Sequence, residues 1–396
     1  MKLVISVIKL ILVLVFGLLT ALLPRRKGLV VFGAWFGHRF ADNPKYLFLS
    51  MLENKSELNP IWLTRSREVY LKYKNIYPVY LSYSLRGIYY SALAEYLIVA
   101  CSFFDAGIFV SKATNIINLW HGAPLKKIIY DDISYKTDVT NLFDDFIYDF
   151  YLSKITYFAT SKTIKEIFIT AFKTKKIEIF GQCRNDIFFN MSFNKDLKQE
   201  NDQVNQYKLN SQTRIISYLP THRKTGQVLI ECSKIFDLEL LNEFCLENNL
   251  IFLIKKHYFH VREVENLDKY NNIVDITSVT FDTMMLLKNT DILITDYSSV
   301  YIDYLLSQRP IIFYSYDYEN YKTSDRDLYF DYDDVIPSKR SNSFSELMMQ
   351  LDEVLSDYSG MCRSNQYKNC LEVFMDSSVR GAASDKIIKK LESREL

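Results

Sequence analysis

Residues 291–304 read Asp-Ile-Leu-Ile-Thr-Asp-Tyr-Ser-Ser-Val-Tyr-Ile-Asp-Tyr, and this stretch decides the predicted fold. Its apolar start at 291–295 predicts a buried strand, and the Tyr-containing segment after it predicts a helix. A buried strand that runs directly into a helix is the repeating unit of a parallel sheet covered by helices. We expect Asp296 or Ser298 to cap this helix. The Ser298 and Ser299 hydroxyls and the first backbone N–H groups would then form an anion site. The alternative is plain capping, which needs only one hydroxyl.

Short apolar runs separated by polar, helix-like stretches recur along the chain in two series, which predicts two doubly wound α/β domains facing a cleft. The candidate strands of the first series are residues 29–32, 61–63, 96–100, 107–110, 116–120, 157–160 and 177–180. Those of the second series are residues 215–219, 250–254, 273–275, 291–295 and 310–314. The predicted domains are residues 28–189 and 214–375, joined by a polar linker or surface helix at 190–213 and followed by a C-terminal helix at 376–396.

The composition is that of a globular protein without a general nucleic-acid partner. The 396 residues carry 48 Lys and Arg against 47 Asp and Glu, a formal net charge of +1. A nucleic-acid binder normally shows an excess of basic residues. The six cysteines form no CxxC pair, which favours free thiols over a zinc site. No P-loop, GxGxxG, GxSxG or HExxH motif occurs, and no dedicated metal site is indicated.

The N-terminal residues 1–27 combine an apolar run at 3–23 with the basic cluster Pro24-Arg25-Arg26-Lys27. The run is long enough to cross a bilayer as a helix, although Lys9 also favours a helix lying in the interface with its basic residues on anionic headgroups. The positive-inside bias predicts that the globular part lies at the cytoplasmic face. The alternative is a buried apolar helix of the first domain.

Ligands of parallel sheets bind beyond the carboxyl ends of the strands, so the residues after each strand are the candidate site. Trp120-His121-Gly122-Ala123-Pro124 follows one strand, and a histidine there suits a general base that takes a proton from a hydroxyl. The alternative is a structural histidine in a turn.

Three further strand ends or loops carry groups suited to phosphate. Thr221-His222-Arg223 and Lys255-Lys256-His257 each follow a strand, and the second could offset charge on a leaving diphosphate. Arg326 lies in a loop between Asp325 and Asp327 and could fork onto a phosphate. The alternatives are a polar loop, a solvated basic turn and a surface ion pair.

In this order the motifs resemble those of the CDP-glycerol:poly(glycerophosphate) glycerophosphotransferase family, whose members build teichoic acids and related capsule polymers. The matching stretches are 120–124, 220–223, 255–257, 295–299 and 326–331, with further likeness at 32–37, 42–46, 303–304, 309–310 and 313–317. Two departures are Cys183, where the family usually has Pro, and Asp327, where it has Gly.

The resemblance implies a GT-B-like fold and transfer of a polyol phosphate from CDP-glycerol or CDP-ribitol, with release of CMP. The acceptor would be a lipid-linked or membrane-bound glycan at the cytoplasmic face of the bacterial membrane. It implies His121 as general base and His257 as the catalytic group on the diphosphate. Donor and phosphate binding would fall to Thr221, Arg223, Lys255, Ser298, Ser299 and Arg326, supported by Gly122, Pro124, Asp296 and Asp303.

Several questions stay open at this point. The sequence does not choose glycerol over ribitol, and a loosely bound divalent cation is left open. One alternative is a GT-B glycosyltransferase that uses a nucleotide sugar. Another is a non-catalytic, membrane-anchored subunit of a polysaccharide assembly.

Overall fold

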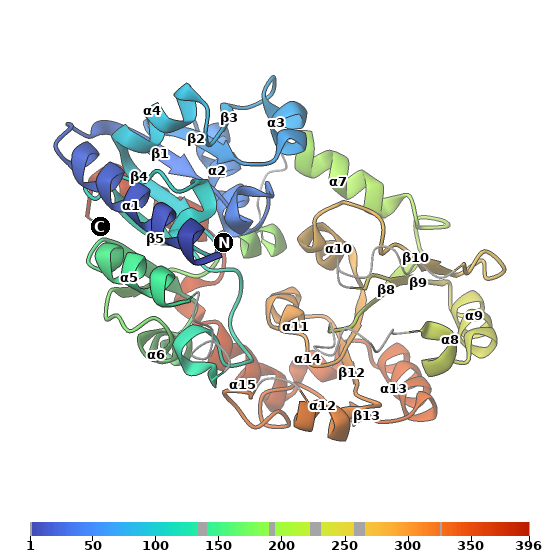
Figure 1. Ribbon diagram of the computed structural model, residues 1–396. Coiled ribbons are helices and arrows are strands. Elements are labelled where there is room, and N and C mark those ends of the chain that lie inside the picture. Colours follow the sequence, from blue (N-terminus) through green and yellow to red (C-terminus); the bar gives the residue numbers. More distant parts are fainter. Residues whose placement is uncertain are drawn as a thin grey trace. The chain divides into compact units, whose positions relative to one another are not determined.

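The computed structural model describes residues 2–133, 141–189, 195–221, 231–256, 266–324 and 327–395 (Figure 1). The chain forms two compact units. Unit 1 comprises Met1–His121, Ile128–Phe189 and Met375–Leu396, and unit 2 comprises Gly122–Lys127 and Asn190–Phe374. Each unit contains one parallel sheet with helices, so the prediction of an α/β protein with two parallel-sheet domains is confirmed.

In the described residues, unit 1 contains a seven-stranded sheet in the order β3-β2-β1-β4-β5-β6-β7, and every pairing is parallel. Its strands are β1 Arg26–Phe32, β2 Asn59–Thr64, β3 Val79–Leu81, β4 Ala94–Val99, β5 Asn115–Asn118, β6 Ile155–Ala159 and β7 Ile177–Ile179. Its helices are α1 Lys2–Ala21, η1 Trp35–Gly37, α2 Asp42–Glu53, α3 Arg67–Tyr73, α4 Leu85–Leu93, η2 Phe103–Ala106, η3 Ile129–Asp131, α5 Asn141–Leu152, α6 Lys162–Ala171, η5 Cys183–Phe188, η8 Ser377–Val379 and α16 Ala383–Ser393.

Unit 2 contains, among its described residues, a six-stranded parallel sheet in the order β10-β9-β8-β11-β12-β13. Its strands are β8 Arg214–Leu219, β9 Leu250–Ile254, β10 Ile273–Asp275, β11 Ile292–Thr295, β12 Ile311–Tyr314 and β13 Arg340–Ser341. Its helices are α7 Lys195–Asn205, α8 Cys232–Ile235, α9 Leu238–Glu247, α10 Thr283–Asn289, α11 Val300–Tyr304, η7 Leu305–Ser307, α12 Tyr318–Ser324, α13 Phe344–Ser356, α14 Gly360–Arg363 and α15 Asn365–Phe374.

The strand order of each sheet reverses once, and this position is where parallel sheets bind ligands. In unit 1 the reversal lies between β1 and β4, and in unit 2 it lies between β8 and β11. The central strands are apolar because both of their faces are covered, and all five residues of β9 are buried. The loops after these four strands therefore define where each unit could hold a ligand.

The predicted strand at 107–110 is wrong. These residues follow the η2 turn and form no strand, although the run is apolar enough to suggest one. The segment begins at Gly107, the C-cap residue of η2, whose φ of 117° lies outside the β region. The short edge strands β3 and β13 were not predicted, because three and two residues carry little periodic signal.

Helix α1 packs along unit 1 with one face and exposes the other. Val13 is fully buried, Phe16 meets Phe109 at a ring distance of 5.0 Å, and a Cβ at Gly17 would lie 2.6 Å from the Tyr151 hydroxyl. Figure 1 shows α1 in dark blue beside α5 in green, and the two helices are in contact. Among the described residues, no helix has the length and apolarity needed to span a membrane.

The C-terminal segment folds back into unit 1. The Asp186 carboxylate accepts hydrogen bonds from the backbone N–H groups of Ala383 and Ser384, both at 2.8 Å, and so caps α16. Helix α16 packs against α2, and Asn54 donates to Asp385 at 3.0 Å. Residues 375–396 thus belong to the packing of unit 1, where the sequence predicted only a separate terminal helix.

Candidate active site

His121 follows β5 and lies in unit 1, on a surface built by the loops after β4 and β1. Its Nδ1 atom lies 3.4 Å from the Ala100 carbonyl oxygen and 3.6 Å from Cys101 Sγ. The imidazole packs on Trp120 and Trp35, with ring distances of 4.1 and 5.3 Å. The side chain is half-buried, so the ring is held in place while part of it stays accessible.

The backbone before His121 is held in an unusual conformation. Trp120 has a φ of 54°, which is unfavourable for a residue with a Cβ. The Asn118 side chain accepts from the Trp120 N–H at 2.9 Å, and the Asn43 side chain donates to the Trp120 carbonyl at 2.9 Å. Gly122 follows with a φ of 136°, which explains why glycine stands there. These bonds fix the direction in which His121 leaves the sheet.

Two motifs far apart in sequence support this conformation. Arg184 pairs with Asp42 at 2.9 Å, and its backbone N–H donates to the Asn43 side chain at 3.1 Å. Asn43 is the residue that holds the Trp120 carbonyl. Cys183, the departure from the family pattern, is fully buried and begins η5, so the turn still forms with cysteine in place of proline.

The residues immediately after His121 belong to unit 2. Within that unit, Lys126 and Leu328 form an antiparallel bridge, and the Tyr329 N–H donates to the Leu125 carbonyl at 3.0 Å. The Lys127 N–H donates to the Asp327 carbonyl at 2.8 Å, and the two side chains pair at 3.1 Å. Pro124 is buried in this segment. Asp327, where the family has glycine, therefore takes part in a backbone pairing that any residue could make.

At the reversal of the unit 2 sheet, Asp296 joins the ends of β8 and β11. Its side chain is fully buried and accepts from the Thr221 N–H at 2.7 Å. The Thr295 hydroxyl makes a second link by donating to the Leu219 carbonyl at 2.7 Å. The structure thus brings together Thr221 and Asp296, which the sequence predicted after two different strands. Asp296 is not the N-cap residue of the following helix, which is Ser299.

Ser298 and Ser299 lie in the turn between β11 and α11. Ser299 is the N-cap residue but makes no side-chain cap, and it is exposed, whereas the Ser298 hydroxyl accepts from the Val300 N–H at 3.4 Å. Since α11 has only five residues, its dipole contributes little, and any anion binding here would rest on the hydroxyls. Asp303 is buried in α11, behind this turn.

Lys255 follows β9, the strand beside β8. Its Nζ atom donates to the Val279 carbonyl at 2.7 Å and lies 4.8 Å from the centre of the Phe281 ring. Burial lowers the pKa of Lys255 to about 8, and nearby Asp282 and Asp275 act in the opposite direction. Lys256, the next residue, is buried and faces Asp275 at 3.8 Å. Lys255 therefore lies at the end of β9, where its backbone N–H donates to the Tyr218 carbonyl of β8 at 3.0 Å and its ammonium is held by the Val279 carbonyl.

An aromatic cluster supports the turn after β11. The rings of Tyr297 and Tyr321 stack at 3.8 Å, and Tyr297 donates to Asp317 at 3.0 Å. The Tyr332 hydroxyl donates to the Asp296 carbonyl at 2.7 Å. Both Tyr297 and Tyr332 are buried, so this cluster serves to fix the backbone at Asp296. The sequence analysis did not anticipate it, since tyrosines are frequent along the chain.

Three predicted site residues, Arg223, His257 and Arg326, lie outside the described residues. Their roles remain predictions. Among the residues that the structure does describe, no group of three or more His, Cys, Asp or Glu side chains is arranged to hold a metal ion.

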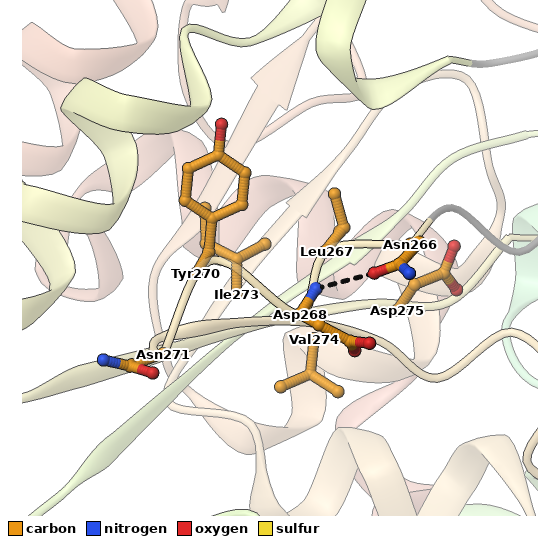
Figure 2. A pocket seen from close by; sticks show the side chains of 8 residues that line it. All are labelled: Asn266, Leu267, Asp268, Tyr270, Asn271, Ile273, Val274 and Asp275. Carbon is orange, nitrogen blue, oxygen red and sulfur yellow. Dashed lines mark hydrogen bonds between the residues drawn. The ribbon is translucent and has the colours of Figure 1, made fainter.

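A hollow of about 500 Å³ lies at the β9–β10 edge of unit 2 (Figure 2). It is lined by Asn266, Leu267, Asp268, Tyr270, Asn271, Ile273, Val274 and Asp275. The Asp268 N–H donates to the Asn266 side chain at 3.0 Å. Among the described residues, two acidic and no basic side chains line this hollow, which makes this lining a poor match for an anionic donor. We place no donor there.

Asp105 is a functional candidate that the sequence analysis missed. It is fully buried, and burial raises the pKa of its carboxyl to about 6. Perturbed, buried acids of this kind concentrate at functional sites. The signal in the sequence was an isolated acid within the apolar run Phe103-Phe104-Asp105-Ala106, but it carried no motif that marks a reaction.

The two parallel sheets make this a two-domain α/β protein. The structure is similar to that of the wall teichoic acid polymerase TagF, with a TM-score of 0.75 and 23% sequence identity, over 99% of this chain and 97% of that chain. This likeness shows the fold, a GT-B-like α/β protein with two parallel-sheet domains.

The sequence profile of the CDP-Glycerol:Poly(glycerophosphate) glycerophosphotransferase family matches residues 16–392, and the chain belongs to this family of transferases. It is 32% identical over 328 residues to a teichoic acid poly(glycerol phosphate) polymerase of Bacillus spizizenii, covering 80% of this chain and 81% of that protein. It is 27% identical over 348 residues to a teichoic acid glycerol-phosphate transferase of Staphylococcus aureus, covering 84% and 86%.

Proposed function

We propose that this chain transfers glycerol phosphate from CDP-glycerol to a hydroxyl of a teichoic acid acceptor and releases CMP. Family membership over residues 16–392 supports the reaction class. The two relatives described above, both named for glycerol phosphate, support glycerol as the polyol. CDP-ribitol is the alternative donor, and the experiment below compares the two.

The reaction displaces CMP from the phosphorus that bears glycerol. The acceptor oxygen forms a new bond to that phosphorus, and the bond from the phosphorus to the bridging diphosphate oxygen breaks. CMP leaves with the bridging oxygen, and the proton of the acceptor hydroxyl passes to the base. Phosphoryl transfer of this kind depends mainly on positioning and on charge stabilisation.

The observation that carries the proposal is the setting of His121. A carbonyl oxygen only accepts hydrogen bonds, so the Ala100 carbonyl beside Nδ1 favours the form in which Nδ1 bears the proton. The Nε2 atom then has the lone pair that a general base needs. We assign the acceptor proton to this nitrogen.

The donor is assigned to the unit 2 sheet reversal. Thr221, Lys255, Ser298 and Ser299 supply hydroxyl, ammonium and backbone donors at the ends of the three neighbouring strands β9, β8 and β11. Asp296 joins two of these strand ends and supports them. The predicted roles of His257 on the diphosphate and of Arg223 and Arg326 on phosphate oxygens complete the proposal.

CMP release from CDP-glycerol and from CDP-ribitol, measured side by side with membrane extract as acceptor, tests the function. Release from CDP-glycerol that is lost in His121→Ala supports both the reaction and the base. Release from CDP-ribitol alone would change the polyol and leave the reaction class intact. Turnover of a nucleotide sugar with neither CDP-polyol consumed would replace the proposal by a glycosyltransferase.

We propose further that α1 lies flat on the cytoplasmic face of the membrane, where a lipid-linked acceptor would be found. Its outer face exposes Ile8, Ile11, Val15, Leu18 and Leu19, and Leu22, directly after the helix, is 85% exposed. An apolar stripe of this kind suits an interfacial helix. Arg26 and Lys27 are exposed beside it and suit anionic headgroups. Arg25 does not join them, because its guanidinium donates to the Thr20, Leu23 and Ala92 carbonyls.

Co-sedimentation with lipid vesicles tests this placement. The wild-type chain should bind vesicles that contain phosphatidylglycerol, and Leu18→Glu with Leu22→Glu should lower binding at least tenfold without changing the circular dichroism spectrum. Arg26→Glu should weaken binding only to the anionic vesicles. Equal binding by the wild type and the double variant would show that α1 is not the contact.

A further inference from the structure

We propose that Asp105 is a positioning residue for His121, holding the Ala100 carbonyl against Nδ1 so that Nε2 remains the unprotonated, basic nitrogen. The inference rests on the proposed role of His121 as general base. It adds a residue that touches neither donor nor acceptor and acts through the backbone. The following contacts carry it.

The Asp105 carboxylate bridges the loops after the two central strands of unit 1. One oxygen accepts from the Phe36 N–H at 2.7 Å, in the loop after β1. The other accepts from the Ala100 and Cys101 N–H groups at 2.9 and 2.8 Å, directly after β4. Both oxygens are thus used on backbone donors, and the side chain is fully buried. Each loop is fixed to the same carboxylate.

The loops fixed by Asp105 are the ones that surround the imidazole. The Ala100 carbonyl lies 3.4 Å from His121 Nδ1, and Trp35, the neighbour of Phe36, packs on the ring. Trp35 and Phe36 both have positive φ, at 50° and 55°. Residues in such conformations persist only where their surroundings hold them, and the bond from the Phe36 N–H to Asp105 does so here.

Because Cys101 also contacts His121, the Ala100 carbonyl is needed to select the tautomer. Its Sγ atom lies 3.6 Å from the same Nδ1 atom, and a neutral thiol can donate to an unprotonated Nδ1. That contact would favour the other tautomer, with the proton on Nε2. Burial raises the pKa of the Cys101 thiol, so the thiol keeps its proton. The position of the Ala100 carbonyl, which Asp105 sets, decides between the two forms.

The position of Asp105 is itself set by close backbone packing. A Cβ at Gly33 would lie 2.4 Å from the Asp105 carbonyl carbon and oxygen, so only glycine allows this approach. Gly33 follows β1, and its N–H donates to the Ile98 carbonyl in β4 at 3.1 Å. The η2 turn that carries Asp105 is therefore seated directly on the sheet reversal.

The other charged groups near this site already have partners. Asp42 pairs with Arg184 at 2.9 Å, and the Arg39 guanidinium lies 5.5 Å from the centre of the Trp35 ring. Both act electrostatically on Cys101, Asp42 raising its pKa and Arg39 lowering it. Asp105 differs from them because it bonds directly to the backbone of the two loops.

The tautomer can be read directly in the wild-type chain. The protein has five histidines, so ¹⁵N-labelled histidine gives few resonances, and the His121 pair is the one missing in His121→Ala. At pH 8 we expect the His121 signals of a protonated Nδ1 and an unprotonated Nε2. A protonated Nε2 in the wild type would overturn the proposal, whatever any variant does.

Asp105→Asn tests the role of the carboxylate in the full chain. An amide NH₂ in place of one oxygen would face a backbone N–H, so one loop loses its bond. We expect His121 to become a mixture of tautomers and kcat to fall about 10–100-fold, by analogy with groups that orient metal-bound histidines. The KM for CDP-glycerol should stay within about twofold, because the donor is assigned to unit 2.

Asp186→Asn is the matched control. Asp186 is also a buried acid of unit 1 that accepts two backbone N–H groups, at the start of α16. The Asp186→Asn variant should have a lower melting temperature and an unchanged His121 tautomer. If Asp105→Asn behaved in the same way, Asp105 would be structural only. If His121→Ala kept full activity while the tautomer shift was seen, the base assignment would fail and the positioning would stand.

Discussion

The two sheets of this protein reverse their strand order in the same way, and a buried aspartate lies at each reversal. In unit 1, Asp105 ties the loops after β1 and β4 through three backbone N–H groups. In unit 2, Asp296 ties the end of β8 to the end of β11 through the Thr221 N–H. Both side chains are fully buried. The groups that the two aspartates support are different.

The unit 1 reversal holds one imidazole in one orientation, whereas the unit 2 reversal presents several hydrogen-bond donors. Proton transfer needs a single nitrogen in the right form, so the loss of that nitrogen removes the whole contribution. Anion binding is spread over hydroxyl, ammonium and backbone donors, each of which contributes part. We therefore expect His121 variants in unit 1 to change kcat, and variants of Lys255, Ser298 and Ser299 in unit 2 to change the KM for the donor.

His121→Ala should have the largest effect. A general base contributes about 10²–10⁴-fold, so kcat should fall by that factor while the affinity for CDP-glycerol stays unchanged. The measurement is CMP release under saturating donor, with donor binding followed by calorimetry. His38→Ala, which removes an exposed histidine of the same unit, is the control and should keep full activity. Retention of more than a tenth of kcat in His121→Ala would falsify the assignment of the base.

Ser298→Ala combined with Ser299→Ala should have the next largest effect. A hydrogen bond to a charged group contributes about 1.5–3 kcal/mol, so the net loss of one such bond should raise the KM for CDP-glycerol about 10–100-fold. The value of kcat should change much less, because the base is untouched. Steady-state kinetics over a range of donor concentrations separates the two. Ser356→Ala, an exposed serine of α13, is the matched control. A fall in kcat at constant KM would contradict the division between the two units.

Lys255→Met should have the smallest effect. It should stabilise the fold and at the same time weaken binding of the donor. The pKa of Lys255 is lowered from 10.5 to about 8, so the folded state binds fewer protons than the unfolded state between these values. The cost of burying the charge is fully present below pH 8 and is relieved as the pH rises toward 10.5. At 1.36 kcal/mol per pKa unit, burying the Lys255 charge costs up to about 3 kcal/mol of folding free energy. The variant avoids this cost but loses the hydrogen bond to the Val279 carbonyl, which offsets part of the gain.

We therefore expect Lys255→Met to raise the free energy of unfolding by about 1–2 kcal/mol at pH 7, and the gain to shrink by pH 10. Its KM for CDP-glycerol should rise, because a cation is lost beside the donor. Urea unfolding at pH 7 and pH 10 and donor titration measure both effects. A variant that is less stable at pH 7 and binds the donor normally would show that Lys255 is held for structure.

The sequence was sufficient for the outline of both regions. The alternation of buried strands and helices predicted two parallel sheets, and the strand-end rule marked His121, Thr221, Lys255 and Ser298. The prediction of the two sheets is confirmed, because burial on both faces forces apolar runs that are visible without any tertiary information. The roles of the four site residues stay predictions. The strand prediction failed at 107–110, where an apolar run follows the η2 turn through Gly107 and forms no strand.

Tertiary structure decided which partner each polar group has. Asp296 looked like a helix cap in sequence, yet its carboxylate accepts a hydrogen bond from the Thr221 N–H in the loop after β8. Arg25 looked like part of a membrane-facing cluster, yet it closes the end of α1. Asp105 lies in no recognisable sequence motif, because the backbone groups that it joins, at Phe36 and Ala100, are 69 and 5 residues away. Hydrophobic periodicity is a local property that a sequence records directly, whereas hydrogen bonds between distant loops exist only once the sheet has placed them side by side.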